Sequence, residues 1–311
     1  RLINGKIERA SAVHSRIRRV IAQSGYAGGG RKKQSALTFL LIKREDLLDN
    51  PDAHDVLCEQ ALERAAFDMR ASMRILRIKP EAGISGAEML GSGASGAITL
   101  GTFRFTSENF NFPLVCLNSY STTPLISAVE CDDLAGIHLV LAHLKALGHE
   151  RIAFFNDHAF DWRNKAHPRR ELVPSAYAGA GLSSSPELLF GEDFKSGEHL
   201  PVIEKAARRF LSLNPRPTAL VLASDIYAPC FYEALRSRGI RIPQDMSVFG
   251  FDNYLVSAML SPSLSSVRKP FETMAREALS LLIERIANPD ASIKRIIVHP
   301  ELVLRASTAP P

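Results

Sequence analysis

The chain has 311 residues, of which 46% are apolar and 23% charged, and its formal net charge is +5. This length exceeds what one hydrophobic core usually covers, so two lobes are expected, with the composition of an ordinary soluble protein. The four cysteines contain no CxxC pair, which argues against a disulfide framework or a cysteine metal site. No apolar run reaches about 18 residues, so no membrane span is expected. We therefore expect a cytoplasmic protein with no metal, no other cofactor and no membrane partner.

Basic residues are concentrated at the start of the chain. Residues 1–34 contain nine lysines and arginines and one acid, a net charge of +8, so the other 277 residues carry −3. Within this segment, residues 11–26 place Val13, Ile17, Val20 and Ile21 on one face of a predicted helix. Residues 27–35, AGGGRKKQS, are typical of a flexible basic linker. Such an arm either contacts a polyanion such as nucleic acid or is a solvated tail.

From residue 36 onward, short apolar runs of strand type alternate with helical stretches. The predicted strands cover residues 36–42, 72–78, 96–100, 113–118, 151–156, 218–224 and 245–251. The predicted helices cover residues 53–71, 132–149, 199–213, 227–239 and 270–287, and residues 294–305 are expected to be extended. This alternation predicts an α/β fold with parallel sheets, and the length predicts two of them facing each other across a cleft.

Three aspartates stand where ligands usually bind in such a fold. Asp252 and Asp225 follow predicted strands directly, and Asp132 follows a shorter extended run and opens a helix. Ligands of open α/β sheets bind beyond the carboxyl ends of the strands. Each aspartate could instead cap the next helix, a role that contributes ~1 kcal/mol. Asp252 is the best placed for a ligand, because Gly250 permits close approach.

Signatures of enzymes are mostly absent. The sequence contains no GxSxG, P-loop, HExxH or GxGxxG motif between a strand and a helix. The glycine-rich stretch at 91–96 precedes a predicted strand instead of opening a helix, which favours a surface loop over a phosphate site. No catalytic residue is therefore assigned. The sequence favours binding over chemistry, and we expect that the protein is not an enzyme.

Several segments, in order, resemble the lactose-repressor/galactose-repressor family of bacterial transcription regulators. The stretches 132–155, DDLAGIHLVLAHLKALGHERIAFF, and 217–253, which ends in SVFGFDN, carry most of this resemblance. The stretch from Ser261 to Ile286 and the terminal ELVLRAST continue it. At the front, RLINGK and RIRRVIAQSGY resemble the end of the family's DNA-binding headpiece. The resemblance thus covers nearly the whole chain.

This resemblance implies a periplasmic-binding-protein-like body of type I. Two Rossmann-like lobes joined by three crossovers would follow the remnant of an all-α, helix-turn-helix headpiece. The implied divisions are a partial headpiece at 1–26, a basic linker at 27–35 and an effector-binding and dimerisation domain at 36–311. Within that domain, the N-lobe would span about 36–147 and 268–292, and the C-lobe about 148–267 and 293–308.

The family's effector, often a sugar or a purine, sits between the lobes and changes affinity for an operator. The resemblance therefore implies a homodimeric repressor with two partners, operator DNA and a small effector (a sugar, a sugar phosphate or a purine). Asp252 matches the family's effector-contacting acid, whose carboxylate suits hydroxyl or N–H donors. The other implied effector contacts are Arg163, Phe194, Asp132, Ser224, Asp225 and Lys269. For Arg163 and Phe194, a surface charge and ordinary packing are the alternative interpretations.

The headpiece part of the resemblance is incomplete. It implies that the first helix and most of the recognition helix are missing from this chain. The DNA contacts that it implies are Asn4, Lys6, Arg16, Arg31, Lys32 and Lys33. Three glycines in the linker disfavour the family's hinge helix by ~1 kcal/mol each relative to alanine. The alternative function is that of a solute-binding protein without a DNA role, for which a signal peptide and no basic front would be expected.

Overall fold

The computed structural model describes residues 37–45, 53–79, 86–101, 112–118, 126–157, 168–192 and 199–311. The predicted basic helix and linker lie outside these residues and stay predictions. The described residues divide into two units, the first comprising those up to Glu130 together with Phe271–Val298. The second comprises those within Cys131–Pro270 and His299–Pro311. The chain passes between the units three times, as the resemblance implied.

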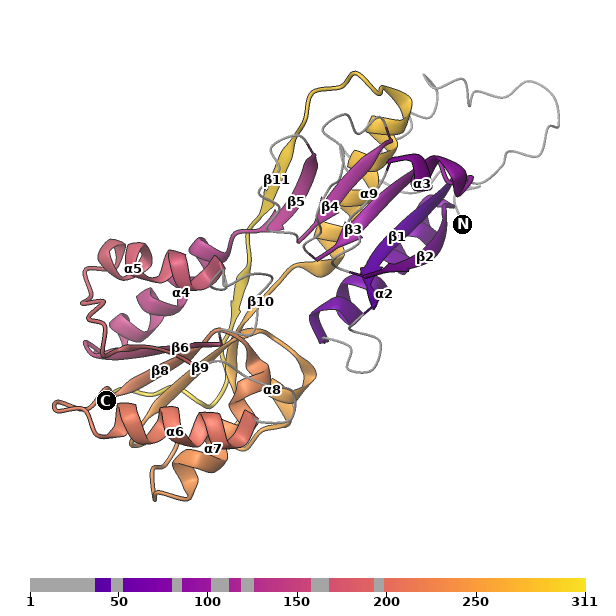
Figure 1. The fold of residues 1–311 in the computed structure, drawn as a ribbon. Helices are drawn as coiled ribbons and strands as arrows, with labels where there is room; N and C mark the ends of the chain where they lie inside the picture. Colours follow the sequence, from indigo (N-terminus) through magenta and orange to yellow (C-terminus); the bar gives the residue numbers. More distant parts are fainter. Residues whose placement is uncertain are drawn as a thin grey trace, which may run out of the picture. The chain divides into compact units, whose positions relative to one another are not determined.

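The first unit is built on a six-stranded sheet with the order β11-β5-β4-β3-β1-β2 (Figure 1). Its strands are β1 (Thr38–Arg44), β2 (Ser72–Ile78), β3 (Gly96–Leu100), β4 (Leu114–Leu117), β5 (Ser127–Cys131) and β11 (Arg295–Val298). Neighbouring strands from β2 to β5 pair in parallel. The helices are α2 (Ala53–Met69), α3 (Gly86–Gly91) and α9 (Phe271–Ala287), and α2 packs against α9. The strands β3 and β4 are buried along their whole length because both faces of a parallel sheet are covered.

The second unit contains another six-stranded sheet, with the order β12-β10-β9-β8-β6-β7. Its strands are β6 (Ile152–Asp157), β7 (Leu189–Glu192), β8 (Ala219–Leu222), β9 (Ser247–Asp252), β10 (Ser265–Arg268) and β12 (Glu301–Val303). Strand β12 runs antiparallel to β10, and the other recorded pairs are parallel. The strands β6, β8 and β9 therefore end at the same edge of the sheet.

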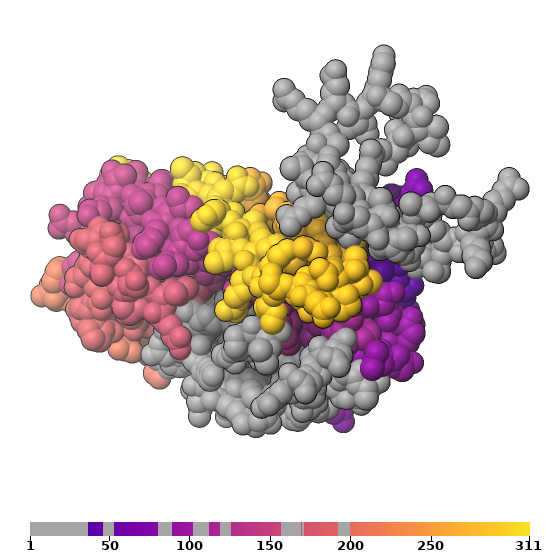
Figure 2. Space-filling model, turned by 90° about the horizontal axis from the view of Figure 1, so that it is seen from above, coloured from indigo at the N-terminus to yellow at the C-terminus, as the bar shows by residue number. Residues whose placement is uncertain are grey.

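Helices cover both faces of this second sheet. The helices α4 (Asp133–Ala146) and α5 (Pro168–Gly179) pack on one face of the sheet through a shared core layer. The outer surface of these helices is visible in Figure 2. The opposite layer contains α6 (His199–Leu211) and α7 (Ala228–Arg236). Two short elements, η3 (Asp225–Tyr227) and α8 (Leu255–Met259), follow the ends of β8 and β9. The unit is thus a doubly wound α/β layer structure, as the alternating pattern predicted.

The last residues of the chain complete the second unit. Ser307 Oγ donates to the carbonyl oxygen of Val248 at 2.6 Å and accepts from the backbone N–H of Ser265 at 2.8 Å. The backbone N–H of Ala309 donates to Ser247 Oγ at 3.0 Å. The start of β9 is therefore held by residues that lie about sixty positions later in the sequence.

The expected division between the lobes differs from the observed one. The sequence placed the boundary after residue 147, but the second unit begins at Cys131 and so includes α4. The apolar stripe of α4, which includes Ile137, Leu141 and Leu144, packs in the same core as Phe154 and Phe249 of the second sheet. The helix itself was predicted, at residues 132–149, but the position of a helix in the sequence does not say which sheet it will cover.

Candidate functional site

The carboxyl edge of the second sheet contains an unusual turn at the end of β9. Asp252 and Asn253 both have positive φ angles, 98° and 57°. Such angles are uncommon for residues other than glycine and indicate a backbone that the surrounding contacts hold in place. The turn directs the Asp252 side chain into the unit, where it is only 4% exposed. Asp252 is therefore a buried acid with fixed partners, and it does not cap a helix.

A buried arginine binds this acid. Arg169 lies in the first turn of α5, and its Nη2 donates to Asp252 Oδ1 at 2.9 Å. Its Nε donates to Oδ2 of Asp133 at 3.0 Å, and its Nη1 donates to the carbonyl oxygen of Ala223. The guanidinium carbon also lies 3.9 Å from the centre of the Phe251 ring. Acceptors on α4, β9 and the end of β8 thus hold one planar group in one orientation.

A second cation completes the group. Lys269 follows β10, its side chain is 2% exposed, and its Nζ lies 3.5 Å from Asp252 Oδ1. We call this group the buried charge cluster. It contains two positive and two negative side chains, those of Arg169, Lys269, Asp133 and Asp252. Burial raises the pKa of the neighbouring Cys131 thiol to about 12, so this thiol stays protonated at neutral pH.

Asp225 is a further buried acid near the cluster, and its hydrogen-bond partners belong to the protein. Its carboxylate accepts from Ser257 Oγ at 2.6 Å, from Ser266 Oγ at 2.8 Å and from the backbone N–H of Tyr254 at 2.9 Å. Burial raises the pKa of this carboxyl to about 7, although the hydrogen bonds lower it. A Cβ on Gly250 would lie 2.0 Å from Asp225 Oδ1. A side chain at position 250 would therefore clash with the Asp225 carboxylate, which explains the glycine. The sequence had instead suggested that Gly250 allows a ligand to approach.

Asp132 caps α4, which was one of its two expected roles. One of its carboxylate oxygens accepts from the backbone N–H of Ala135 at 2.9 Å. The other lies 3.3 Å from His299 Nδ1, and the Asp132 side chain is 25% exposed. Ser224 precedes η3, is partly exposed and makes no side-chain cap bond there. Asp132 and Ser224 are therefore the predicted site residues of this edge that solvent reaches.

Arg163 and Phe194, and the suggested DNA contacts at Asn4, Lys6, Arg16, Arg31, Lys32 and Lys33, lie outside the described residues. Sequence reasoning did not select Arg169 or Asp133. A signal for Arg169 was present, because it shares a helical face with the buried residues Val173, Ala176 and Tyr177. A charge on an apolar face is a candidate for a buried ion pair.

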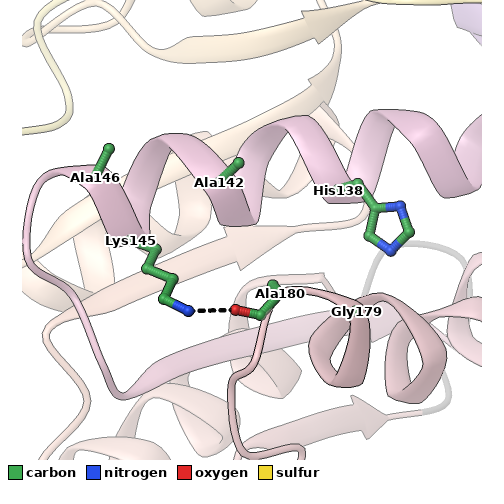
Figure 3. Close-up of a pocket in the computed structure, with 6 residues that line it drawn as sticks. All are labelled: His138, Ala142, Lys145, Ala146, Gly179 and Ala180. Atoms are coloured by element: carbon green, nitrogen blue, oxygen red, sulfur yellow. Dashed lines mark hydrogen bonds between the residues drawn. The ribbon is translucent and has the colours of Figure 1, made fainter.

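A separate hollow lies between α4 and α5 (Figure 3). It has a volume of about 440 Å³ and is lined by His138, Ala142, Lys145, Ala146, Gly179 and Ala180. The Nζ of Lys145 donates to the carbonyl oxygen of Ala180 across it at 2.5 Å. Four of the six lining residues are alanine or glycine and Lys145 is engaged with Ala180, so His138 is left as the lining side chain that could orient a ligand. The buried charge cluster is therefore the better candidate for a functional site.

The fold and this site define the class of a two-unit α/β binding protein. Residues 141–308, more than half of the chain, match the family described as "Periplasmic binding protein-like domain". The chain belongs to this family. Among the described residues, no helix combines the length and apolarity that a bilayer crossing needs.

Several known proteins are similar to the chain. The HTH-type transcriptional repressor PurR of Aliivibrio fischeri (strain MJ11) is 31% identical over 202 residues, 64% of this chain and 58% of the repressor. The match thus spans less than two thirds of that relative. An uncharacterized HTH-type transcriptional regulator of Streptomyces limosus is 28% identical over 99% of this chain and 90% of its own. The solved complex of the transcriptional regulator CelR with cellobiose covers 99% of this chain and 94% of its own, with a TM-score of 0.70 and 22% identity, a likeness of fold.

Proposed function

We propose that the protein is a DNA-binding transcription regulator, and specifically a repressor of the lactose-repressor/galactose-repressor type, whose operator affinity is switched by a small effector. The observation that carries this proposal is the similarity to an HTH-type regulator along 99% of this chain, which includes most of the basic segment at residues 1–34. A net charge of +8 in residues 1–34 suits contact with DNA phosphates. The body carries a net negative charge, so DNA binding would be restricted to the front.

The effector would bind at the carboxyl edge of the second sheet. We propose Asp252, Arg169 and Lys269 as its charged contacts, with Ser224 and Asp132 at the exposed part of the edge. A guanidinium held by three acceptors is preorganised, so a ligand that contacts it loses little of its binding energy to ordering side chains. Among similar proteins, CelR was solved with the sugar cellobiose, which fits a small metabolite effector. Asp225, with its internal partners, would support this edge without contacting the effector.

Operator recognition would require two copies of the chain. Repressors with helix-turn-helix headpieces bind pseudo-palindromic sites as dimers, one headpiece to each half-site. We therefore propose a homodimer that acts on DNA in the cytoplasm. The alternative is a solute-binding protein without a DNA role, which would have the same ligand site but would not bind operator DNA.

Selection of DNA fragments from the source genome by the natural full-length protein tests the proposal. We expect a small set of fragments to be enriched and to bind in gel-shift titrations with affinities that fall steeply from 50 to 200 mM salt. A variant with Arg31, Lys32 and Lys33 changed to glutamine provides the matched comparison. It should lose affinity about equally for all fragments and show a shallower salt dependence. Absence of any sequence preference would refute the regulator and favour the solute-binding alternative.

A further inference from the structure

Among the described residues, the buried charge cluster has equal numbers of positive and negative side chains. Asp133 and Asp252 supply two negative charges, Arg169 and Lys269 supply two positive charges, and each of the four residues is at most 4% exposed. Each of the three guanidinium nitrogens of Arg169 already donates to a protein oxygen. A ligand that reaches the cluster therefore meets no excess of positive charge among these four residues.

The beginning of α4 is also occupied by carboxylates. Helix N-termini commonly bind anions, because their first backbone N–H groups lack partners within the helix. In α4, the Asp132 carboxylate accepts from the N–H of Ala135, and the Asp133 carboxylate lies in the first turn. A guanidinium and a helix N-terminus are the two usual devices for binding an anion, and here the protein's own acids already contact both.

We propose that Asp133 determines specificity at this site, so that the site accepts uncharged effectors rich in hydroxyl or N–H groups and excludes phosphorylated or carboxylated ones. The proposal rests on the proposed effector site, and it narrows the effector class from sugars, sugar phosphates and purines to the uncharged members. An anion beside the cluster would lose its hydration next to two carboxylates. Its binding would be unfavourable, because the arginine and the lysine already pair with these carboxylates. Carboxylates instead suit the hydroxyl and N–H donors of a neutral ligand, because they act only as acceptors.

Inorganic phosphate is the simplest probe of this exclusion. Thermal unfolding and calorimetric titration of the full chain would be measured in phosphate and in chloride of equal ionic strength. We expect no specific phosphate binding by the wild-type chain. Asp133→Asn keeps the side-chain shape and leaves the cluster with one net positive charge. That variant should show saturable phosphate binding, at least about tenfold tighter than the weakest binding that the titration can detect, the effect of one charge-assisted hydrogen bond.

An exposed ion pair elsewhere in the second unit provides the matched control. Asp245 accepts from Arg241 Nε at 2.7 Å, and Arg241 is 71% exposed. Asp245→Asn makes the same change in charge and also removes a carboxylate from an arginine, but in solvent. We expect it to gain no phosphate binding. An equal gain in both variants would overturn the proposal, since any loss of an acid would then suffice.

The other outcomes are equally decisive. Saturable phosphate binding by the wild-type chain, or no gain in Asp133→Asn, overturns the role of Asp133. If Asp133→Asn does not fold, Asp133→Ser replaces it, and the wild-type titration decides on its own whether anions are excluded. Asp133→Glu, which retains the charge, should exclude phosphate as the wild type does. These measurements contain no DNA, so their failure is distinguishable from failure to find an operator.

Discussion

Arg169 is expected to contribute more to the stability of the second unit than any exposed ion pair. Arg169→Met retains an unbranched side chain of similar length but removes the guanidinium, so that Asp133 and Asp252 lose their shared partner. Both ion pairs of Arg169 join side chains that are 3% to 4% exposed. Removing one partner from such a buried pair typically destabilises a protein by about 3–5 kcal/mol, because the remaining charge is left uncompensated.

Urea unfolding followed by circular dichroism would measure this loss. Hydrogen exchange of peptides from α4 and β9 would localise it to the second unit. Arg236→Met is the matched control, since Arg236 is 79% exposed in its pair with Glu233 and should contribute at most about 1 kcal/mol. Arg169→Lys should lie between the two, because it retains the charge but not the fork. A loss below about 1 kcal/mol for Arg169→Met, indistinguishable from that of Arg236→Met, would refute the reasoning.

Two further predictions concern the neighbouring acids. Burial raises the folded-state pKa of Asp225 to about 7, above its unfolded value, so the stability that its proton provides is lost as pH rises through 7. Urea midpoints should show the wild type losing roughly 2 kcal/mol more than Asp225→Asn between pH 5 and 8, and parallel pH profiles would contradict this. Asp132→Ala should cost about 1 kcal/mol through loss of the α4 cap. If its melting temperature equals that of the wild type, the cap has no energetic role.

The layers of the fold were predictable from the sequence, because they follow from local periodicity. The apolar runs at β1, β8 and β9 and the helical pattern at 132–149 predict strands and a helix without reference to the rest of the chain. Helix α5 was missed because Pro174 lies inside it and its apolar positions follow a segment without a clear pattern. The unit to which α4 belongs could not be predicted, since an amphipathic helix can pack on either sheet.

The site was predicted only in part, because its partners are distant in the sequence. Asp252 stood out through its place after a strand and Asp132 through its place at a helix start, whereas Lys269 was implied only by the family resemblance. The pairing of Arg169 with Asp133 and Asp252 joins positions separated by 36 and 83 residues. No spacing rule connects such positions before the sheet order is known. Missing α5 therefore also meant missing the arginine at its first turn.

The interleaved course of the chain has a consequence for its synthesis. Ribosomes deliver residues in order, and domains generally fold as they emerge, the N-terminal one first. Here most of the second unit, up to Pro270, emerges before α9 of the first unit has been made. Ser307 and Ala309, which hold the start of β9, emerge later still. Neither unit can therefore finish folding ahead of the other by a wide margin, and a nascent chain stopped before residue 299 would leave β9 without these bonds.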